Sequence, residues 1–446
     1  MSALVIDLKA HFYALADHVQ RHLHAGEGFT LWFTGEQSDF VRFNHGRVRQ
    51  AGNVTQGYLT LRLVAGQKHI TQTYAVAGNQ GDLALTTDVL GTLRVALSDV
   101  LDDPHLLLAE EVHSTEVVAT NRLPATEEMV ADIVDIAGGV DLVGFLASGP
   151  VYTGFANQHG QRNWFETVSW NFDWSLYSHG DKAVKRGSAG KAWNRAEIAA
   201  SVAEARSQLA LLAKPVRSLS PGAYRAYLTP AAVGELTRLL DWGGFSEKQI
   251  RTKRSALGKL VAGEALLSQQ FSLVEDTLGG LAPNFQGDGF IKPEQVELIR
   301  EGRMVGSLIS PRTAKEYGIP TNGAGAQEGS ESFSMAPGTL ASADALKALG
   351  TGLYVSNLWY LNYSDQPACR MTGMTRFASF WVENGEIVAP LNVMRFDDSA
   401  YRMLGSELEA LTVEQAFLAD PLTVEARSRV SQRLSGALLK DWRLVL

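Results

Sequence analysis

The side chains that bind transition metals best are scarce in this sequence. Its last histidine is His179, and its only cysteine is Cys369. Catalytic zinc is usually held by three protein ligands drawn from histidine, cysteine and carboxylates. The part of the chain after His179 can therefore bind zinc only through carboxylates or through ligands from elsewhere. A single cysteine also excludes an internal disulfide and is typical of a reducing compartment.

Long apolar runs and an excess of positive charge are absent as well. No segment approaches ~20 uninterrupted apolar residues, so we expect no membrane-spanning helix. The apolar stretch 4–6 is too short for a signal peptide and charged residues follow it at once, so we expect a cytoplasmic protein. The formal net charge of −8 argues against direct binding of nucleic acid. The short basic run 182–191 is interpreted as a solvated loop.

The usual cofactor and nucleophile motifs are missing too. The glycine-rich stretch 322–329 has its third glycine one position too late for a dinucleotide fingerprint, so a flexible loop is the better interpretation. The sequence has neither a G-x-x-x-x-G-K-[ST] phosphate loop nor a G-x-S-x-G nucleophile elbow. We therefore expect no nucleotide cofactor.

The chain has the composition of an ordinary globular protein. Its 446 residues are 45% hydrophobic and 20% charged, which predicts two or more domains. Apolar residues at helical spacing predict helices over 4–24 and 80–100 and a helix that begins near Thr126. Short runs rich in branched and aromatic residues, separated by glycine-containing turns, predict strands at 30–34, 40–43, 47–51, 58–63 and 69–74.

Residues 140–178 predict a meander of strands. The clearest strand is 164–176, where Trp164, Trp170 and Trp174 lie on one face and alternate with polar residues. Aromatic rings on a sheet can bind sugars or bases, but alternating apolar residues normally mark a buried face. A buried sheet face is the favoured interpretation.

A domain boundary is predicted at the Lys214–Pro215 break, after a helix over 193–213. The two domains are then 1–215 and 216–446. In the second, a strand at 224–228 leads to a helix that begins at Thr229.

Two hairpins are expected further along the second domain. One spans 296–309, and the other spans 377–389 with Asn384–Gly385 in its turn. Residues 423–446 predict the final strands.

Isolated histidines offer only weak metal sites. His18 and His22 lie four residues apart on the first predicted helix, with His24 nearby, a spacing that can hold a metal. Val19 stands where a metallopeptidase would place its glutamate, so a solvated helix face is favoured.

His159 and His179 have no second histidine or cysteine close in sequence and are interpreted as structural. Cys369 has Arg370 beside it, which can lower a thiol pKa, but no histidine near it in sequence, so a catalytic thiol is disfavoured.

An ordered set of segments resembles the TldD/PmbA family, whose members are also called modulators of DNA gyrase. The resemblance is dense over about 220–400 and thinner over the rest. The matching segments are 42–50 (RFNHGRVRQ), 285–291 (FQGDGFI), 296–308 (VELIREGRMVGSL), 312–318 (RTAKEYG), 321–323 (TNG), 350–355 (GTGLYV), 372–373 (TG) and 380–388 (FWVENGEIV).

This resemblance implies an α+β fold in two domains. The N-terminal α/β domain would contain a curved, mainly antiparallel sheet with helices, and the C-terminal domain a barrel-like, mainly antiparallel sheet. TldD-type members carry H-E-x-x-x-H on a helix and, with a later cysteine, bind the metal that cleaves unfolded peptides. TldE-type members lack the motif and pair with a TldD-type subunit.

Laid on this chain, the metal motif falls on Thr229, Pro230 and Gly234, none of which is a metal ligand. No cysteine is present in 423–446. The resemblance therefore implies a TldE-like chain with no metal, no cofactor and no catalytic residue of its own. It would hold an extended or unfolded peptide, for proteolysis or peptide maturation, together with a TldD-like subunit or a second copy of itself.

Polar and aromatic residues around the strand that begins at Leu353 are the candidate peptide contacts. They are Asn357, Tyr360, Asn362, Arg370, Thr372 and Arg376.

Two alternatives remain open from the sequence. One is an active peptidase that uses Cys369 or an unusual metal site assembled from His18, His22 or His179. The other is a homodimeric module that binds a ring-shaped ligand on the face from Trp164 to Trp174.

Overall fold

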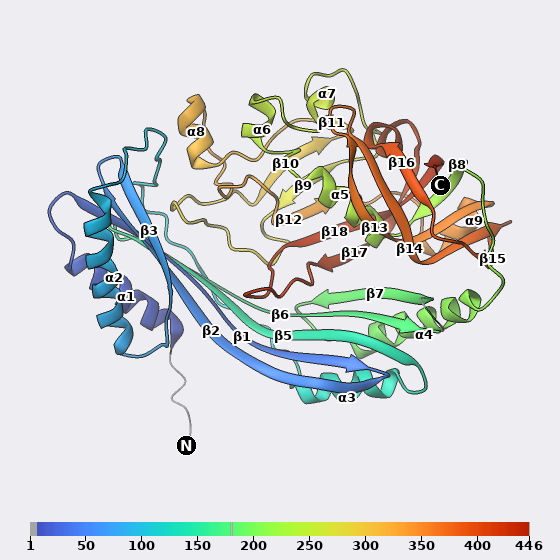
Figure 1. Ribbon diagram of the computed structural model, residues 1–446, viewed down its shortest axis with the longest axis horizontal. Helices are drawn as coiled ribbons and strands as arrows, with labels where there is room; N and C mark the ends of the chain where they lie inside the picture. Colours follow the sequence, from blue (N-terminus) through green and yellow to red (C-terminus); the bar gives the residue numbers. More distant parts are fainter. Residues whose placement is uncertain (1–6, 179, 181, 446) are drawn as a thin grey trace.

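The computed structural model describes residues 7–178, 180 and 182–445. Its first sheet is built from β1 (Glu27–Asn44), β2 (Arg47–Ala65), β3 (Lys68–Ala75), β4 (Glu116–Val117), β5 (Asp141–Asn157), β6 (Arg162–Tyr177) and β7 (Ala183–Gly190). The spatial order is β3-β2-β1-β5-β6-β4, and β7 pairs with β6. Figure 1 shows this sheet as a long curved layer beneath the rest of the molecule.

Helices cover one end and the outer face of the first sheet. They are α1 (Leu8–Arg21), α2 (Gly81–Leu97), α3 (Thr126–Ile136) and α4 (Arg195–Leu212). α1 and α2 lie together at one end, α3 lies below the sheet, and α4 lies beside β7 near the other end (Figure 1). The apolar stripe predicted for the first helix is confirmed, because Phe12, Leu15 and Val19 are buried.

The first two strands are much longer than predicted, since glycines expected in turns lie inside them. Gly35 of β1 is paired with Gly57 of β2. A Cβ on Gly35 would lie 2.8 Å from the ring of Phe33, and a Cβ on Gly57 would lie 3.0 Å from the same ring. The two glycines therefore leave room for the Phe33 ring, and they do not mark a turn.

The tryptophan-bearing strand forms as predicted and becomes β6. Trp164, Trp170 and Trp174 are all buried, at 2%, 5% and 1% exposure. The three rings belong to the cores of the first sheet and are closed to a sugar or a base. The alternative of a ring-binding platform on this face is therefore wrong.

The basic run 182–191 is not the predicted solvated loop. It contains β7, which pairs with β6 along its whole length, from Tyr177↔Ala183 to Trp170↔Gly190. Lys185 bonds to Asp173 of β6 at 2.6 Å, and Arg186 bonds to Glu204 of α4 at 2.7 Å. Carboxylates from other elements thus balance the positive charge of the strand.

The second sheet contains the remaining strands. They are β8 (Gly222–Leu228), β9 (Leu273–Asp276), β10 (Gln295–Arg300), β11 (Arg303–Met304), β12 (Ser332–Met335), β13 (Gly352–Asp365), β14 (Arg370–Glu383), β15 (Glu386–Pro390), β16 (Arg395–Ser399), β17 (Leu408–Ala419) and β18 (Ser431–Leu444). Its order is β11-β10-β9-β12-β18-β16-β14-β13-β8, and a further β18–β8 pairing closes part of it into a ring. All pairs between these strands are antiparallel except β12–β18 and β13–β8. The expected α+β fold with a barrel-like second sheet is confirmed.

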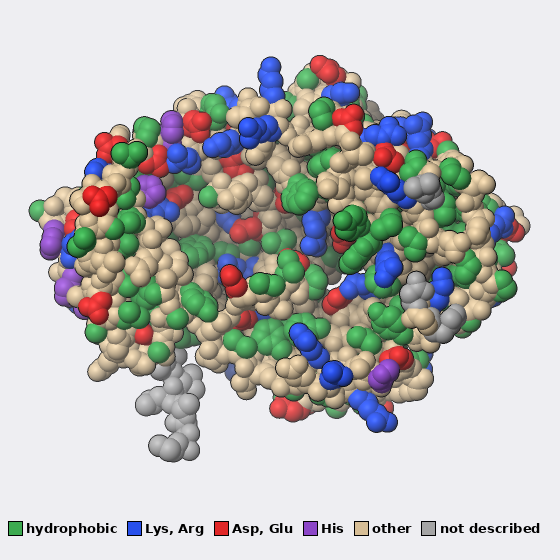
Figure 2. Space-filling view, viewed as in Figure 1, with side chains coloured by type: hydrophobic (Ala, Val, Ile, Leu, Met, Phe, Trp, Pro, Cys, Tyr) green, Lys and Arg blue, Asp and Glu red, His purple; other side chains and the backbone are tan. Residues whose placement is uncertain are grey.

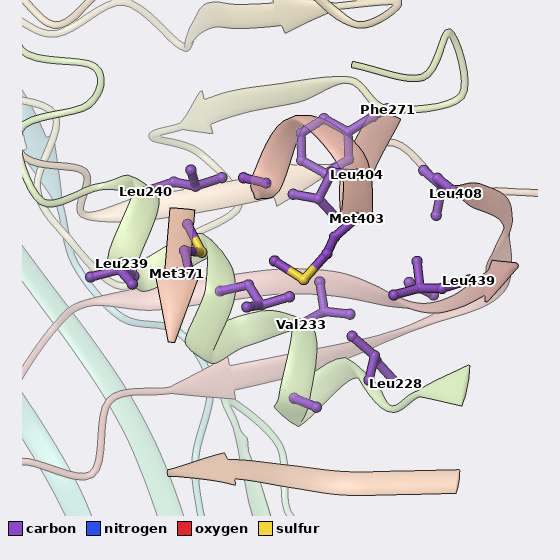
Figure 3. Packing of buried hydrophobic residues seen from close by; sticks show 14 of the residues in the cluster. Leu228, Val233, Leu239, Leu240, Phe271, Met371, Met403, Leu404, Leu408 and Leu439 are labelled. Carbon is purple, nitrogen blue, oxygen red and sulfur yellow. The ribbon is translucent and has the colours of Figure 1, made fainter. Parts of the chain in front are cut away.

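Helix α5 (Pro230–Leu240) packs against this ring. Its apolar side chains Val233, Leu239 and Leu240 belong to the main core of the second sheet. Figure 3 shows them among Leu228 of β8 and Met371 of β14, which are far apart in the sequence. The core therefore fixes the helix tightly. The smaller helices of this half are α6 (Glu247–Arg251), α7 (Gly258–Val261), α8 (Pro311–Tyr317), α9 (Ala345–Leu349) and the short turns η1 (Ser342–Asp344) and η2 (Arg402–Ser406).

Both predicted hairpins form, although the second strand of the first one, β11, has only two residues. The glycine-rich stretch 322–329 is an ordered connection. Its Glu328 is buried and accepts hydrogen bonds from Ser246 and Ser310, which join it to two other segments.

No helix within the described residues combines the length and the apolar character that a membrane span requires. The strands of the first sheet end at Gly190 and those of the second begin at Gly222. The division into 1–215 and 216–446 stays a prediction.

Candidate functional site

The helix that resembles the metal-motif helix begins as its sequence predicts. Thr229 is the N-cap, and its hydroxyl oxygen accepts a hydrogen bond from Ala232 N at 3.4 Å. The same hydroxyl donates to the carbonyl oxygen of Ser356 at 2.6 Å. Pro230 follows at the first helical position, where its missing N–H is no loss. Thr229 therefore caps α5 and ties it to β13.

Gly234 lies on the side of α5 that faces β17 and β18. A Cβ at this position would be 3.1 Å from Leu418 Cδ1 and 3.5 Å from Leu434 Cδ1. Gln432 Oε1 would be 3.4 Å away, so a side chain at this position would need the Leu418 methyl group to shift. The side chains at 229, 230 and 234 are a hydroxyl already engaged, a proline ring and a hydrogen, and this set does not fit a catalytic zinc ion.

A cleft of about 130 Å³ opens beside Gly234, where the two sheets meet. We call it the inter-sheet cleft. Residues from both sheets and from α5 line it, and those that matter here are Asn171, Lys185, Glu235, Arg238, Asn357 and Leu418. Figure 2 shows a narrow opening bordered by charged and hydrophobic side chains at this junction.

The charges in the inter-sheet cleft are nearly balanced. Besides the Lys185–Asp173 pair, Arg238 lies 3.5 Å from Asp420. Burial raises the pKa of Glu235, and the neighbouring Arg238 and Lys185 counter part of that shift. Among the described residues, no three His, Cys, Asp or Glu side chains lie close enough to hold a metal ion.

The cleft also has hydrogen-bonding capacity that the fold does not use. Asn171 is 8% exposed, and its Nδ2 has no hydrogen-bond partner within the described chain. β7 pairs only with β6, and residues 417–419 of β17 pair only with β18, as far as the structure describes them. Two strand edges therefore border the cleft with main-chain groups that another strand could bind.

Of the predicted peptide contacts, only Asn357 lines this cleft. Arg376 is its cross-strand partner in β14, and its guanidinium lies 5.9 Å from the ring centroid of Trp359. Tyr360 is 79% exposed and has a positive φ of 59°.

The other three candidates lie farther along the same hairpin. Arg370 is paired with Asp397, and Thr372 donates its hydroxyl to Phe396 O at 2.9 Å. Asn362 accepts from the N–H of its neighbour Tyr363. The structure therefore brings Gly234 and Asn357 together but leaves these residues apart from them.

Sequence reasoning missed most of the side chains that shape the cleft. The sequence predicts a loop at Lys185, because a strand with two adjacent cations and two glycines carries little β signal. Leu418 and Arg238 carry no motif, so only the tertiary fold reveals their place.

The isolated histidines have protein partners. His18 Nε2 lies 2.7 Å from Thr87 Oγ1, and His22 Nδ1 lies 2.7 Å from His18 O. Burial, together with the nearby His22 and Arg21, lowers the pKa of His18. His159 contacts the Gln158 amide, and His179 lies outside the described residues.

Cys369 is fully buried, and burial raises the pKa of its thiol to about 12. A thiol with such a pKa is uncharged at neutral pH and makes a poor nucleophile. Cys369 is therefore poorly suited to act as the nucleophile of a thiol peptidase.

Comparisons with known proteins agree with this architecture. Residues 221–442 match the family described as the PmbA/TldA metallopeptidase C-terminal domain. The comparison with curated proteins finds no match. The crystal structure of TldE from Thermococcus kodakarensis is similar, with 13% identity and a TM-score of 0.78 over 98% of this chain and 100% of that one.

Two crystal structures described as putative modulators of DNA gyrase are also similar. That from Thermotoga maritima has 14% identity and a TM-score of 0.74 over 98% of this chain and 100% of its own. That from Bacteroides thetaiotaomicron has 12% identity and a TM-score of 0.74 over 99% of both chains. At these identities the likeness establishes the fold.

Proposed function

This chain belongs to the TldD/PmbA family, and we propose that it acts there as a metal-free, TldE-like subunit that holds an extended peptide for a catalytic partner. The observation that carries the proposal is the contact between α5 and β17. A leucine methyl group lies 3.1 Å from where a side chain at Gly234 would begin. The side chains at this place could not hold a metal ion with a bound water.

The inter-sheet cleft would hold the peptide through its main chain. An extended segment can add to the outer edge of β7 or β17, which supplies hydrogen bonds that do not depend on the peptide's sequence. Asn171 of the first sheet and Asn357 of the second sheet both line this cleft and add polar side chains to its walls. Such contacts suit a subunit that accepts many unfolded substrates.

The partner would supply the bond cleavage. In the family, the chain with H-E-x-x-x-H holds the metal, so a TldD-like subunit is the partner we propose, with a second copy of this chain as the other possible assembly. The cleavage serves proteolysis or peptide maturation in the cytoplasm. No step of the reaction is assigned to this chain beyond binding and orienting the peptide.

Co-purification from the native host, followed by metal analysis, tests the proposal. A companion chain with H-E-x-x-x-H and stoichiometric metal in the complex, but none in this chain alone, is the expected result. Peptide cleavage should need both chains, and Asn357→Ala should raise the KM of the complex more than it changes kcat. Stoichiometric zinc on the isolated chain that survives dialysis, with chelator-sensitive cleavage, would overturn the proposal.

A further inference from the structure

A second cavity lies at the C-terminal end of α5. It has a volume of about 1180 Å³, and the end of α5, α6, α7 and the tip of the β13–β14 hairpin form its walls. Figure 1 places α6 and α7 on the side of the second sheet that faces away from the first. We call this cavity the basic cleft.

Three cations, Lys253, Arg254 and Lys259, line the basic cleft together with the carboxylates of Asp241 and Glu264. Lys253, Arg254 and Lys259 make no side-chain hydrogen bond or ion pair with any described residue. By contrast, the cations of the inter-sheet cleft are all paired with carboxylates. The three cations outnumber the two carboxylates and have no ion-pair partner among the described residues, so this part of a chain of net charge −8 favours an acidic ligand.

The basic cleft also offers an apolar contact and several amides. The indole of Trp242, which directly follows the C-cap of α5, is 67% exposed. Gln249, Gln327 and Gln366 line the same space, and their side-chain amides can both donate and accept hydrogen bonds. These groups match the alternating donors and acceptors of a peptide main chain.

Hydrogen bonds fix the walls in place. Arg254 N donates to Gln249 O at 2.7 Å, and Gln366 Nε2 donates to Arg254 O at 2.9 Å. Ser255 Oγ donates to Gly244 O at 2.7 Å. Because the loop with the cations is joined to α6 and to the hairpin tip, the cleft is preformed and needs little ordering when it binds.

We infer that the basic cleft binds an acidic segment of the extended peptide, with an apolar or aromatic side chain against Trp242. This inference rests on the proposed function and adds a preference for acidic sequence to it. A peptide fits better than a phosphorylated ring compound, because the exposed Trp242 and the glutamine amides can contact an apolar side chain and the main chain of a peptide.

The two clefts are close enough for one peptide to occupy both. Glu235 in the inter-sheet cleft and Trp242 in the basic cleft are seven positions apart in the chain. This is about 10 Å along a helix axis, or roughly three residues of extended peptide. The acidic residues should therefore lie at least about three positions from the residue held beside Gly234.

Fluorescence anisotropy with two labelled, unstructured peptides tests the inference on the full chain. One peptide carries Asp and Glu around a leucine, and the other carries Asn and Gln at the same positions. The wild-type chain should bind the acidic peptide at least about tenfold more tightly at low salt, and the preference should shrink as salt rises. Lys253→Gln, Arg254→Gln and Lys259→Gln together should abolish it.

The matched control is Lys347→Gln, an exposed lysine of α9 with no side-chain partner in the described chain. It should keep the acidic preference, and the thermal midpoint of every variant should equal that of the wild type. Equal wild-type affinity for both peptides overturns this inference but leaves the proposed function intact. Failure of the wild type, alone or with its partner, to bind either peptide overturns both.

Single-stranded DNA and a nucleoside triphosphate are the competing probes. Neither should displace the acidic peptide at equal charge concentration. Displacement by either one, with binding lost in the triple variant, would show that the cleft serves a phosphorylated ligand and would overturn the inference. Trp242→Ala should weaken the affinity for the leucine-bearing peptides several-fold and leave the affinity for a leucine-free acidic peptide unchanged.

Discussion

Gly234 of α5 and Leu418 of β17 lie so close that a Cβ on the glycine would be 3.1 Å from the leucine Cδ1. The two residues come from distant parts of the chain, and their contact packs α5 against β17. Glycine here allows α5 to pack closely against β17, and a larger residue would require Leu418 to move.

Gly234→His should destabilise the fold without creating a metal site. The imidazole would have to displace Leu418 and Leu434, which costs about 1–3 kcal/mol. The measurement is urea unfolding together with zinc analysis after dialysis. Gly91→His is the matched control, since Gly91 lies in α2 with nothing within 4 Å of its missing Cβ. A stable Gly234→His variant that retains one zinc per chain would contradict the packing argument.

Stability should fall as pH rises because of Asp241. Burial raises the pKa of this carboxyl to about 6, from an ordinary value of 3.8, and hydrogen bonds from Ser330 oppose the shift. Between those two pH values the folded chain keeps a proton that the unfolded chain has lost, so the free energy of unfolding decreases with pH there and levels off above.

Asp241→Asn should remove this dependence. Relative to the wild type, the variant should gain up to about 3 kcal/mol between pH 4 and pH 7. Urea midpoints at the two pH values measure the difference. Parallel profiles for the two proteins would show that Asp241 is ionised with an ordinary pKa in the folded chain.

Much of the local structure follows from the sequence, whereas the contacts that shape the clefts do not. Thr229 and Pro230 predict the start of α5, since capping depends only on neighbours. The partner of Gly234 could not be predicted, because β17 has no regular alternation and lies far away in the sequence. β7 could not be predicted from the sequence, because the carboxylates that balance its charge, Asp173 and Glu204, come from other elements.

The loop between β17 and β18 should loosen without Arg427. Its guanidinium donates to Gly149 O at 3.0 Å and to Ser169 O and Oγ, both at 3.0 Å, and so joins this loop to the first sheet. Burial lowers the pKa of Arg427 to about 10, which keeps it charged at neutral pH. Arg427→Ala should cost about 1–3 kcal/mol.

Hydrogen exchange over 420–430, with the thermal midpoint, measures the effect. Arg443→Ala is the control, because Arg443 is exposed and its side chain has no partner among the described residues. Unchanged exchange over 420–430 in Arg427→Ala would show that these hydrogen bonds do not hold the loop.

Asn171 should limit stability while it supports peptide binding. Its buried Nδ2 lacks an acceptor, so Asn171→Leu should raise the free energy of unfolding by about 1 kcal/mol. Asn163→Leu in the same strand should have the opposite effect, since Asn163 Nδ2 donates to His113 O at 2.8 Å and Thr115 Oγ1 at 2.9 Å. Urea unfolding of both variants gives the two signs directly.

The same two variants separate an effect on stability from an effect on peptide binding. Asn171→Leu should weaken the affinity for an extended peptide several-fold, because the residue lines the inter-sheet cleft and leucine offers a peptide no polar contact. Asn163→Leu should leave the affinity of the folded chain unchanged, since Asn163 does not line that cleft. A stabilised Asn171→Leu variant with wild-type peptide affinity would place the peptide elsewhere, whereas a destabilised one would mean that the amide already has a partner.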